Sequence, residues 1–386
     1  MLESRFEESS GVMRVLLAAE RQHEREHGRR AALHLGLDCA ASDCVPLSDL
    51  RVRLVRQPPG DLVLVFLDGD TATALRAVRQ AAEQTQQPVY AITRYQQDAE
   101  VVEAARAAGA ADVWPYDAVR DRLLEAIEEL RRSGRVPEIR GRIVSVTAAV
   151  GGAGCTTVAT GLAFTLAERE QNVVLAELGT RVPQLALNLD LQPKHSLAEL
   201  IQAGERMDGS MVRSTAVQHP DKVDVLAYFP ETLAAEELTP DNVRDFQVIL
   251  RNLYRWIVLD AGPQHGLEAE AILRAADLVV VLTRLDPPGL RLTRKYVRTL
   301  VDNGVSAQDI VIVANRYGQS GQVPWQKAEE ALQRKIEAWL PDDPRAVNNA
   351  LILGRSVTQT ARWSRLSREL RRLASALLAR LTSANS

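Results

Sequence analysis

The sequence lacks the features that mark secreted and membrane-spanning proteins. Its three cysteines, Cys39, Cys44 and Cys155, are too few for a disulfide framework, which favours a reducing compartment. No apolar run approaches the about 20 residues of a membrane-spanning helix. The charged N-terminal stretch does not have the pattern of a secretory signal. We therefore expect a cytoplasmic protein.

The sequence also lacks an excess of charge of either sign. Lys and Arg number 47 against 50 Asp and Glu, a net charge of −3, which excludes a generally basic nucleic-acid coat protein. We expect no nucleic-acid partner. The 386 residues are 46% hydrophobic and 25% charged, as in ordinary folded proteins. At about 100–200 residues per domain, this length predicts two or three domains.

Residues 11–132 alternate apolar runs with helical patterns. Apolar runs bounded by polar residues predict buried strands at 12–18, 62–67 and 88–93. Amphipathic patterns predict helices at 71–83, 98–108 and 118–130. This alternation indicates βαβ units, and we expect a five-stranded parallel sheet with helices on both faces.

This first zone resembles a response-regulator receiver domain, which has a flavodoxin-like fold. Residues 107–115, AAGAADVWP, are similar to the Gly-Ala…Lys-Pro stretch before the family's last helix. The phospho-acceptor Asp of that family aligns with Phe66 in this chain. Asp68 and Asp70 lie two and four residues later, and Trp114 replaces the family's Lys. Because an acyl phosphate needs a carboxylate, a divalent cation and a Lys, we predict a pseudo-receiver that contacts proteins. Phospho-acceptance through Asp68 is the alternative.

A charged segment at 133–140, with Gly134 and Pro137, predicts a linker. A second, longer α/β pattern fills residues 141–386. It opens with a predicted strand at 143–148 and a predicted helix at 157–168. We expect a doubly wound, mostly parallel sheet with any ligand at the carboxyl ends of its strands.

A glycine-rich turn joins the first of these strands to its helix. Such a turn points backbone N–H groups at an anion, and glycine allows close approach and positive φ angles. The candidate nucleotide-binding residues are Gly151, Gly152, Ala153, Gly154, Cys155, Thr156 and Thr157. The alternative is a glycine-rich turn that binds nothing.

This turn resembles the deviant P-loop of the ParA/MinD-type ATPases, Lys-Gly-Gly-x-Gly-Lys-Thr-Thr. The glycines and threonines match, but Val150 and Cys155 stand where that family has its two lysines. In the family the first Lys reaches across a dimer and the second contacts the β- and γ-phosphates. Each loss removes a positive charge from a site for a highly charged anion. ATP or ADP could still bind through backbone donors, Mg²⁺ and Thr156, but we expect little or no hydrolysis and assign no catalytic residue.

The resemblance also assigns strands to residues 173–177, 255–260, 277–283 and 310–315, and a carboxylate ends each of the first two. The resemblance implies that Asp260 serves Mg²⁺ together with Thr156; the alternative is a turn or helix cap. Glu177 stands where the family has the first Asp of Asp-x-Asp, and it is one methylene longer.

After the strand at 310–315, Asn315 and Arg316 complete the candidate site. The family places an Asn at this position against the adenine edge; a turn Asn is the alternative. A second hypothesis, a cycling ATPase, needs a cation that replaces the lysines. The residues available for that role are Arg181, Arg284 and Arg316.

Two further segments resemble the TadZ/CpaE branch, the proteins of the Flp (tight-adherence) pilus assembly system. They are QLALNLDLQPKHSLAEL at 184–200 and VNNALILG at 347–354, after a Pro-Asp stretch at 340–343. That branch also has a receiver-like domain before the ATPase-like domain. The resemblance implies a homodimer, pilus-assembly partners (a secretion ATPase or an inner-membrane platform) and recruitment to the inner membrane or a cell pole. Two alternatives stay open, an active ParA/MinD-like ATPase that positions a cellular assembly and a scaffold that binds no nucleotide.

The C-terminal segment 361–386 has six arginines, one glutamate and leucines at three- and four-residue spacing. This pattern predicts a basic amphipathic helix. Such a helix could make peripheral contact with an anionic membrane, or its apolar face could pack on the sheet.

Overall fold

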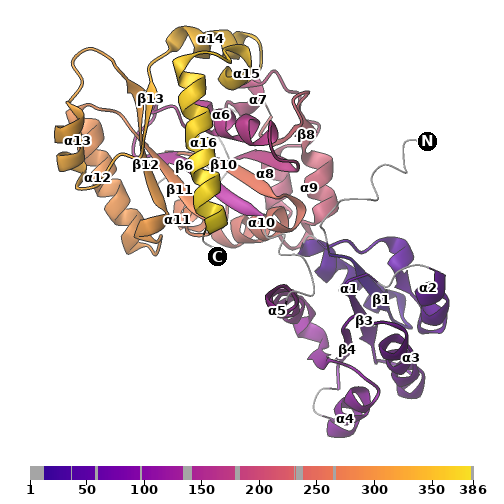
Figure 1. Cartoon of the computed structure of the whole chain (residues 1–386). Helices are drawn as coiled ribbons and strands as arrows, with labels where there is room; N and C mark the ends of the chain where they lie inside the picture. The colour runs from indigo at the N-terminus through magenta and orange to yellow at the C-terminus, as the bar shows by residue number, and fades with distance from the viewer. Residues whose placement is uncertain are drawn as a thin grey trace. The chain divides into compact units, whose positions relative to one another are not determined.

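The computed structural model describes residues 13–383 except 36, 57–59, 96–97, 134–140, 179–182, 230, 232–237 and 264–266 (Figure 1). The chain divides into two compact units: residues 1–140 with 208–210 form the first, and residues 141–207 with 211–386 form the second. The predicted linker at 133–140 lies, apart from residue 133, outside the described residues. Each unit is an α/β fold around its own parallel sheet.

The first unit contains a five-stranded sheet with the order β2-β1-β3-β4-β5, and all its neighbours are parallel. Its elements are β1 (Val15–Ala18), α1 (Gln22–His34), β2 (Cys44–Val45), α2 (Leu50–Arg56), β3 (Leu62–Phe66), α3 (Thr71–Gln84), β4 (Val89–Thr93), α4 (Ala99–Ala107), β5 (Asp112–Pro115) and α5 (Val119–Arg132). Strands β1, β3 and β4 are buried along their whole length, which explains their continuous apolar runs. The predicted flavodoxin-like parallel sheet is confirmed.

The second unit contains an eight-stranded sheet with the order β13-β12-β11-β6-β10-β7-β9-β8. Its strands are β6 (Arg142–Ala148), β7 (Val173–Glu177), β8 (Val217–Gln218), β9 (Val223–Leu226), β10 (Trp256–Pro263), β11 (Leu278–Thr283), β12 (Ile310–Tyr317) and β13 (Ala338–Pro341). Only the β8–β9 pair is antiparallel among these described strands. The predicted doubly wound, mostly parallel sheet is therefore confirmed.

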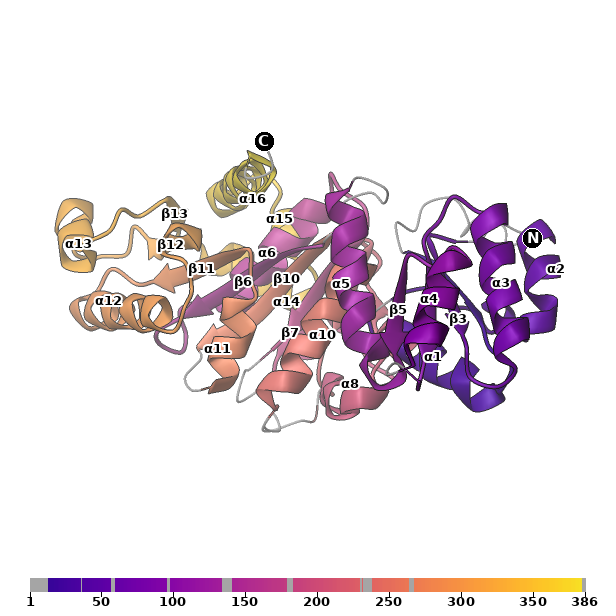
Figure 2. The same ribbon diagram turned by 90° about the horizontal axis from the view of Figure 1, so that it is seen from below.

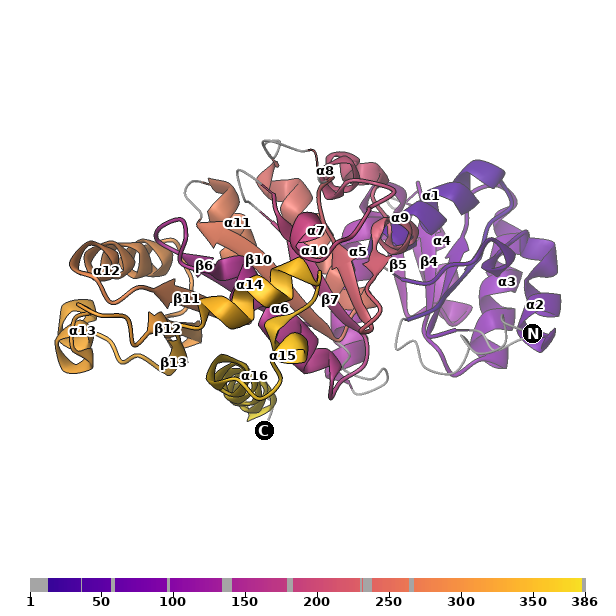
Figure 3. The ribbon, with the colours of Figure 1, turned by 90° about the horizontal axis from the view of Figure 1, so that it is seen from above.

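Helices cover both faces of this larger sheet. They are α6 (Cys155–Ala167), α7 (Leu185–Asn188), α8 (Leu197–Gln202), α9 (Gly209–Thr215), α10 (Pro240–Leu253), α11 (Leu267–Arg274), α12 (Pro287–Asp302), α13 (Trp325–Leu332), α14 (Pro344–Ile352), α15 (Val357–Thr360) and α16 (Arg365–Ser383). Figures 2 and 3 agree that α10, α11 and α12 lie on one face and α6 and α16 on the other. The strand order places β6 and β10 near the centre of the sheet.

The apolar face of α16 packs against α6 and the sheet. Leu366, Leu370, Leu373, Leu377 and Leu381 are all buried in one core cluster with residues of α6. The two helices approach closely at Gly161, where an added Cβ would lie 2.8 Å from a methyl carbon of Leu370. The packing alternative for 361–386 is confirmed, and a membrane contact through the leucine face is excluded because those leucines form the core. Among the described helices, none is both long and apolar enough to span a membrane.

Candidate functional site

The glycine-rich loop has the geometry of an open anion cradle at the end of β6. Gly152 (φ 73°) and Gly154 (φ 95°) both adopt the left-handed conformation, and Gly154 is the N-cap of α6. An added Cβ at Gly151 or Gly152 would meet nothing within 4 Å. Because α6 is buried along most of its length, its N-terminal N–H groups have a fixed direction, as anion binding requires.

Asn315, near the end of β12, contacts this loop through a side-chain hydrogen bond. Its side-chain amide donates a 2.7 Å hydrogen bond to the carbonyl oxygen of Ala153, and its Oδ1 accepts one of 2.9 Å from the amide of Arg316. A Cβ on Gly154 would lie 2.4 Å from Asn315 Nδ2. Asn315 is thus close to the loop, as the resemblance implies. In this structure it positions the loop, and its contact with an adenine edge stays a prediction.

Asp260 is a fully buried carboxylate in β10 with unmet bonding capacity. Within the described residues, neither of its oxygens reaches hydrogen-bonding geometry. Burial raises the pKa of Asp260 to about 6, although the nearby Thr156 hydroxyl and Gly262 amide act to lower it. A buried carboxylate without full hydrogen bonding is costly unless a cation faces it. Asp260 and Thr156 therefore fit the oxygen ligands that a hydrated Mg²⁺ prefers.

Glu177 lies beside Asp260 on the adjacent strand β7, in direct register. Its Oε1 accepts hydrogen bonds from the amides of Gln184 (2.7 Å) and Leu185 (3.0 Å). Burial, and then the negative charge of Asp260, raise the pKa of Glu177 to about 7. One oxygen of Glu177 is therefore committed to the backbone at the start of α7, which leaves less freedom to orient a water molecule.

Neither position of the two missing lysines carries a positive charge. Cys155 is buried in the core cluster around α6. Burial and the carboxylate of Asp260 raise the pKa of its thiol well above the usual range, so the thiol is neutral. Val150 is partly exposed. The loop therefore offers an anion only backbone N–H groups and threonine hydroxyls.

Of the three arginines considered as replacements, Arg316 is the described one without an ion pair. Arg181 lies outside the described residues, and Arg284 forms an ion pair with Asp286 (3.3 Å). Arg316 is exposed, makes no ion pair within the described part of the chain, and directly follows Asn315. Its backbone is left-handed (φ 54°), and its carbonyl oxygen accepts a 2.7 Å hydrogen bond from Gln322. A left-handed arginine is uncommon and typical of functional positions.

The segments 184–200 and 347–354, which are far apart in the sequence, meet beside the loop. An added Cβ on Gly354 would lie 2.6 Å from the Cβ of Asp190. Thr156, Thr157, Asn188, Leu189, Val347 and Leu351 line one small cavity between them. Sequence reasoning singled out both segments but had no means to place them together.

Exposed apolar side chains surround this junction, and sequence reasoning missed them. Leu187, Leu351, Ile352 and Leu353 are all exposed, Ile352 to 82%. They come from α7 and from the end of α14. A cluster of large apolar side chains on the surface is typical of an interaction site.

In the first unit, Asp68, the alternative phospho-acceptor, forms an ion pair with Arg94. Asp68 is only 2% exposed; its Oδ2 lies 3.2 Å from Arg94 Nε, and its Oδ1 accepts a hydrogen bond from the Arg94 amide. The guanidinium of Arg94 also stacks 3.6 Å from the centre of the Tyr116 ring. Asp70 instead accepts a hydrogen bond from the Ala72 amide at the start of α3. Asp68 is therefore poorly accessible to a phosphoryl donor, which favours the pseudo-receiver interpretation.

Comparison with curated proteins finds relatives among putative septum site-determining proteins. The chain is 27% identical over 183 residues to the putative septum site-determining protein MinD of Emiliania huxleyi, covering 45% of this chain and 63% of that protein. It is 26% identical over 180 residues to the protein of the same name from Tupiella akineta, covering 45% and 56%. The chain thus spans less than two thirds of the length of either relative.

Solved structures show the same fold. The ParA family ATPase from Chlorobium tepidum superposes with a TM-score of 0.56 at 22% identity, covering 61% of this chain and 98% of that one. The cell division ATPase MinD from Pyrococcus furiosus gives 0.53 at 23%, covering 62% and 99%. MinD from Pyrococcus horikoshii, solved with Mg-ADP, gives 0.53 at 20%, covering 61% and 96%.

The family profile described as "Cellulose biosynthesis protein BcsQ" matches residues 142–376, which is more than half of the chain. The glycine-rich loop, Asn315 and Asp260 all lie inside that range. The chain therefore belongs to this family, and its second unit is a ParA/MinD-like P-loop ATPase fold.

Proposed function

We propose that this protein is a nucleotide-gated positioning factor that binds ATP or ADP with Mg²⁺ and hydrolyses it little or not at all. One observation carries the proposal: the anion cradle and the buried Asp260 are intact, while both lysine positions are uncharged. A cradle that had lost all function would not need left-handed glycines facing open space.

In this proposal the loop 151–157 holds the phosphates through backbone N–H groups and the N-terminus of α6. Thr156 and Asp260 hold Mg²⁺, which supplies positive charge that the missing lysines do not. Arg316 is the side chain that adds a further positive charge, since it is exposed and follows the residue that holds the loop.

Weak hydrolysis follows from the same residues. Phosphoryl transfer depends on charge stabilisation around the γ-phosphate, and Val150 and Cys155 provide none. Glu177 is partly committed to the backbone of α7. Nucleotide then acts through its different affinities for monomer and dimer rather than through turnover.

The exposed side chains of Leu187, Ile352 and Leu353 support dimerisation beside the loop. Burying them is worth about 25 cal/mol for each Å² of apolar surface removed from water. Because they lie at the junction beside the nucleotide site, bound nucleotide and a dimer partner would influence each other's affinity.

We propose the Flp pilus assembly system as the cellular role, on the TadZ/CpaE-like segments at 184–200 and 347–354. Residues 11–132 then act as a pseudo-receiver, joined by a linker at 133–140, that recruits a secretion ATPase or an inner-membrane platform at the inner membrane or a cell pole. The family profile favours a second candidate, positioning of a cellulose biosynthesis complex.

Sedimentation velocity tests the switch. ATP with Mg²⁺ should convert the full-length chain from monomer to dimer, and Ile352→Asp should block the conversion. Leu292→Asp, a comparably polar change at an exposed leucine of α12, should leave it intact. An unchanged monomer in ATP, with both variants alike, would favour a scaffold that binds no nucleotide. Affinity purification from the native cell would then separate pilus from cellulose partners.

A further inference from the structure

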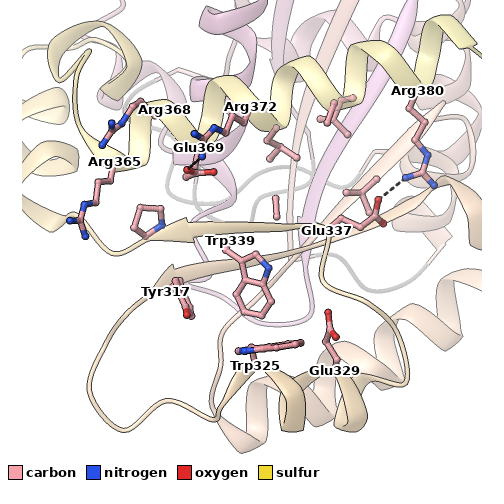
Figure 4. Close-up of a pocket in the computed structure, with 16 residues that line it drawn as sticks. Tyr317, Trp325, Glu329, Glu337, Trp339, Arg365, Arg368, Glu369, Arg372 and Arg380 are labelled. Carbon is pink, nitrogen blue, oxygen red and sulfur yellow. Dashed lines mark hydrogen bonds and ion pairs between the residues drawn. The ribbon is translucent and has the colours of Figure 1, made fainter.

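A second surface feature of the ATPase-like unit lies away from the glycine-rich loop. An open groove of about 1040 Å³ runs between α16, β13 and α13. Figure 4 shows β13 along its middle, the arginines of α16 on one side and Trp325 of α13 on the other. None of the candidate nucleotide residues lines it. The groove is therefore separate from the proposed nucleotide site.

The groove follows the free edge of the sheet. Strand β13 is at the end of the strand order and pairs with β12. Among the described strands, none pairs with its other edge. An open edge presents backbone N–H and C=O groups that can accept an additional strand.

The two sides of β13 differ in chemistry. Leu340 and Ala338 pack into the core beneath α16, whereas Trp339 points the other way, toward Trp325 (Figure 4). Tyr317 meets the Trp339 ring edge-on with 5.1 Å between ring centres. Tyr317 and Trp325 are both exposed. One side of the strand edge is therefore aromatic.

The other side is basic. Arg365 and Arg368 line the groove and are exposed, and neither has an ion pair or side-chain hydrogen bond within the described part of the chain. The other arginines along this wall have partners: Arg372 is paired with Glu369 (2.5 Å), and Arg380 with Glu337 (2.8 Å). On the aromatic side, Glu329 accepts a 2.9 Å hydrogen bond from the Ile336 amide and has no ion pair among the described residues. Two unpaired arginines against one unpaired glutamate leave the groove positive overall, and the positive charge lies at its Arg365 end.

We propose that this groove binds an extended acidic segment of a partner protein, which adds as a strand to the free edge of β13. Successive side chains of a strand point to opposite faces of the sheet. Acidic side chains would therefore meet Arg365 and Arg368, and the alternating apolar or aromatic ones would meet Trp339 and Trp325. Backbone hydrogen bonds supply affinity, and the alternation supplies specificity.

A second copy of this chain is a poorer occupant of the groove. A second β13 edge would bring the same excess of positive charge, and the groove residues of that copy offer no unpaired acidic pair to meet Arg365 and Arg368. Like charges placed across an interface oppose association. Charge complementarity thus selects an acidic partner.

Fluorescence anisotropy with the full-length chain tests the proposal. The probe is a labelled short peptide of alternating acidic and apolar residues (Asp-Phe-Glu-Val repeated). The expected result is saturable binding that weakens about tenfold in the double variant Arg365→Glu/Arg368→Glu, as the loss of two exposed ion pairs predicts. The double variant Arg51→Glu/Arg79→Glu changes two exposed arginines of the first unit and the same net charge, and it should bind like the unmodified protein.

Three control peptides test charge, alternation and backbone hydrogen bonding separately. A peptide with lysines in place of its acidic residues and one with the same composition in blocks should both fail to bind. A peptide with alternate backbone amides methylated should bind much more weakly, because it cannot complete the ladder with β13. The proposal is overturned if millimolar acidic peptide does not bind, or if any of these peptides or the Arg365/Arg368 variant binds as tightly as the reference. It is also overturned if sedimentation shows a dimer that the Arg365→Glu/Arg368→Glu change dissociates, since the occupant is then a second copy.

Discussion

The side-chain amide of Asn315 donates a 2.7 Å hydrogen bond to the carbonyl oxygen of Ala153, 162 residues earlier in the chain. This bond links the end of β12 to the glycine-rich loop between β6 and α6. The loop is therefore held by a side chain from another strand as well as by its own glycines. The candidate nucleotide site therefore forms only when strands β6 and β12 are both in place in the sheet.

Replacement of Asn315 should loosen the loop without removing any of its residues. Asn315→Ala leaves the buried Ala153 carbonyl and the Arg316 amide without their partner, at a cost of about 1–3 kcal/mol in the free energy of unfolding. Nucleotide affinity should fall as well, because the loop is no longer fixed. Chemical denaturation and calorimetry measure the two effects. Gln326→Ala, at an exposed amide of α13, should change neither.

Alanine substitutions at two glycines of the loop should differ in their effect on stability, although both weaken nucleotide binding. Gly154→Ala places a Cβ 2.4 Å from Asn315 Nδ2 at a left-handed residue, and we expect it to cost about 1–3 kcal/mol of stability. Gly151→Ala meets nothing within 4 Å, so its stability should change by less than about 0.5 kcal/mol. Its methyl group still enters the cradle and should weaken nucleotide binding. Equal stability losses in the two variants would contradict this geometry.

The buried carboxylates predict a pH dependence with a definite sign. Burial raises the pKa of Asp260 from 3.8 to about 6 and that of Glu177 from 4.5 to about 7. The folded state thus binds these protons more tightly than the unfolded state, so their contribution to stability is complete at low pH and is lost as the pH rises to about 7.

Asp260→Asn removes one of these titrations. The variant should gain stability relative to the unmodified protein as the pH rises from about 4 to about 6 and keep that gain at higher pH, because its amide never ionises. Melting temperatures of both proteins across this range provide the comparison. A variant that is progressively less stable than the unmodified protein as the pH rises would show that ionised Asp260 stabilises the fold.

The first unit should not accept a phosphoryl group. Asp68 is buried against Arg94, and Arg94 stacks on Tyr116. Incubation with acetyl phosphate and Mg²⁺ should leave the intact mass unchanged. A mass increase of one phosphoryl group that Asp68→Asn abolishes would restore the phospho-acceptor alternative.

Apolar runs predicted the strands of this protein well. The bounds of β7 (173–177) agree with the prediction: Asn172 precedes the apolar run, and Glu177 ends it. Helix α6 begins at Cys155, two residues before the predicted start, since Gly154 caps it in a left-handed conformation that spacing does not reveal. Strand β2 has only two residues, too short to show a pattern.

Contacts between distant segments limited the prediction of the site. The candidate residues were correctly expected at the ends of strands, but the Asn315–Ala153 bond and the junction of α7 with α14 depend on tertiary packing. The same holds for α16, whose pattern fitted both a membrane surface and a core. The close approach of Gly161 and Leu370 decides between them.

Calorimetric titration of the full-length chain with ATP and ADP, with and without Mg²⁺, tests the central claim most directly. The account predicts micromolar binding of nucleotide that Gly154→Asp weakens strongly, with a Mg²⁺ dependence that Asp260→Ala removes, and no turnover above background. Absence of binding at millimolar nucleotide would contradict it and leave the glycine-rich loop as a structural turn in a scaffold that works through protein contacts alone.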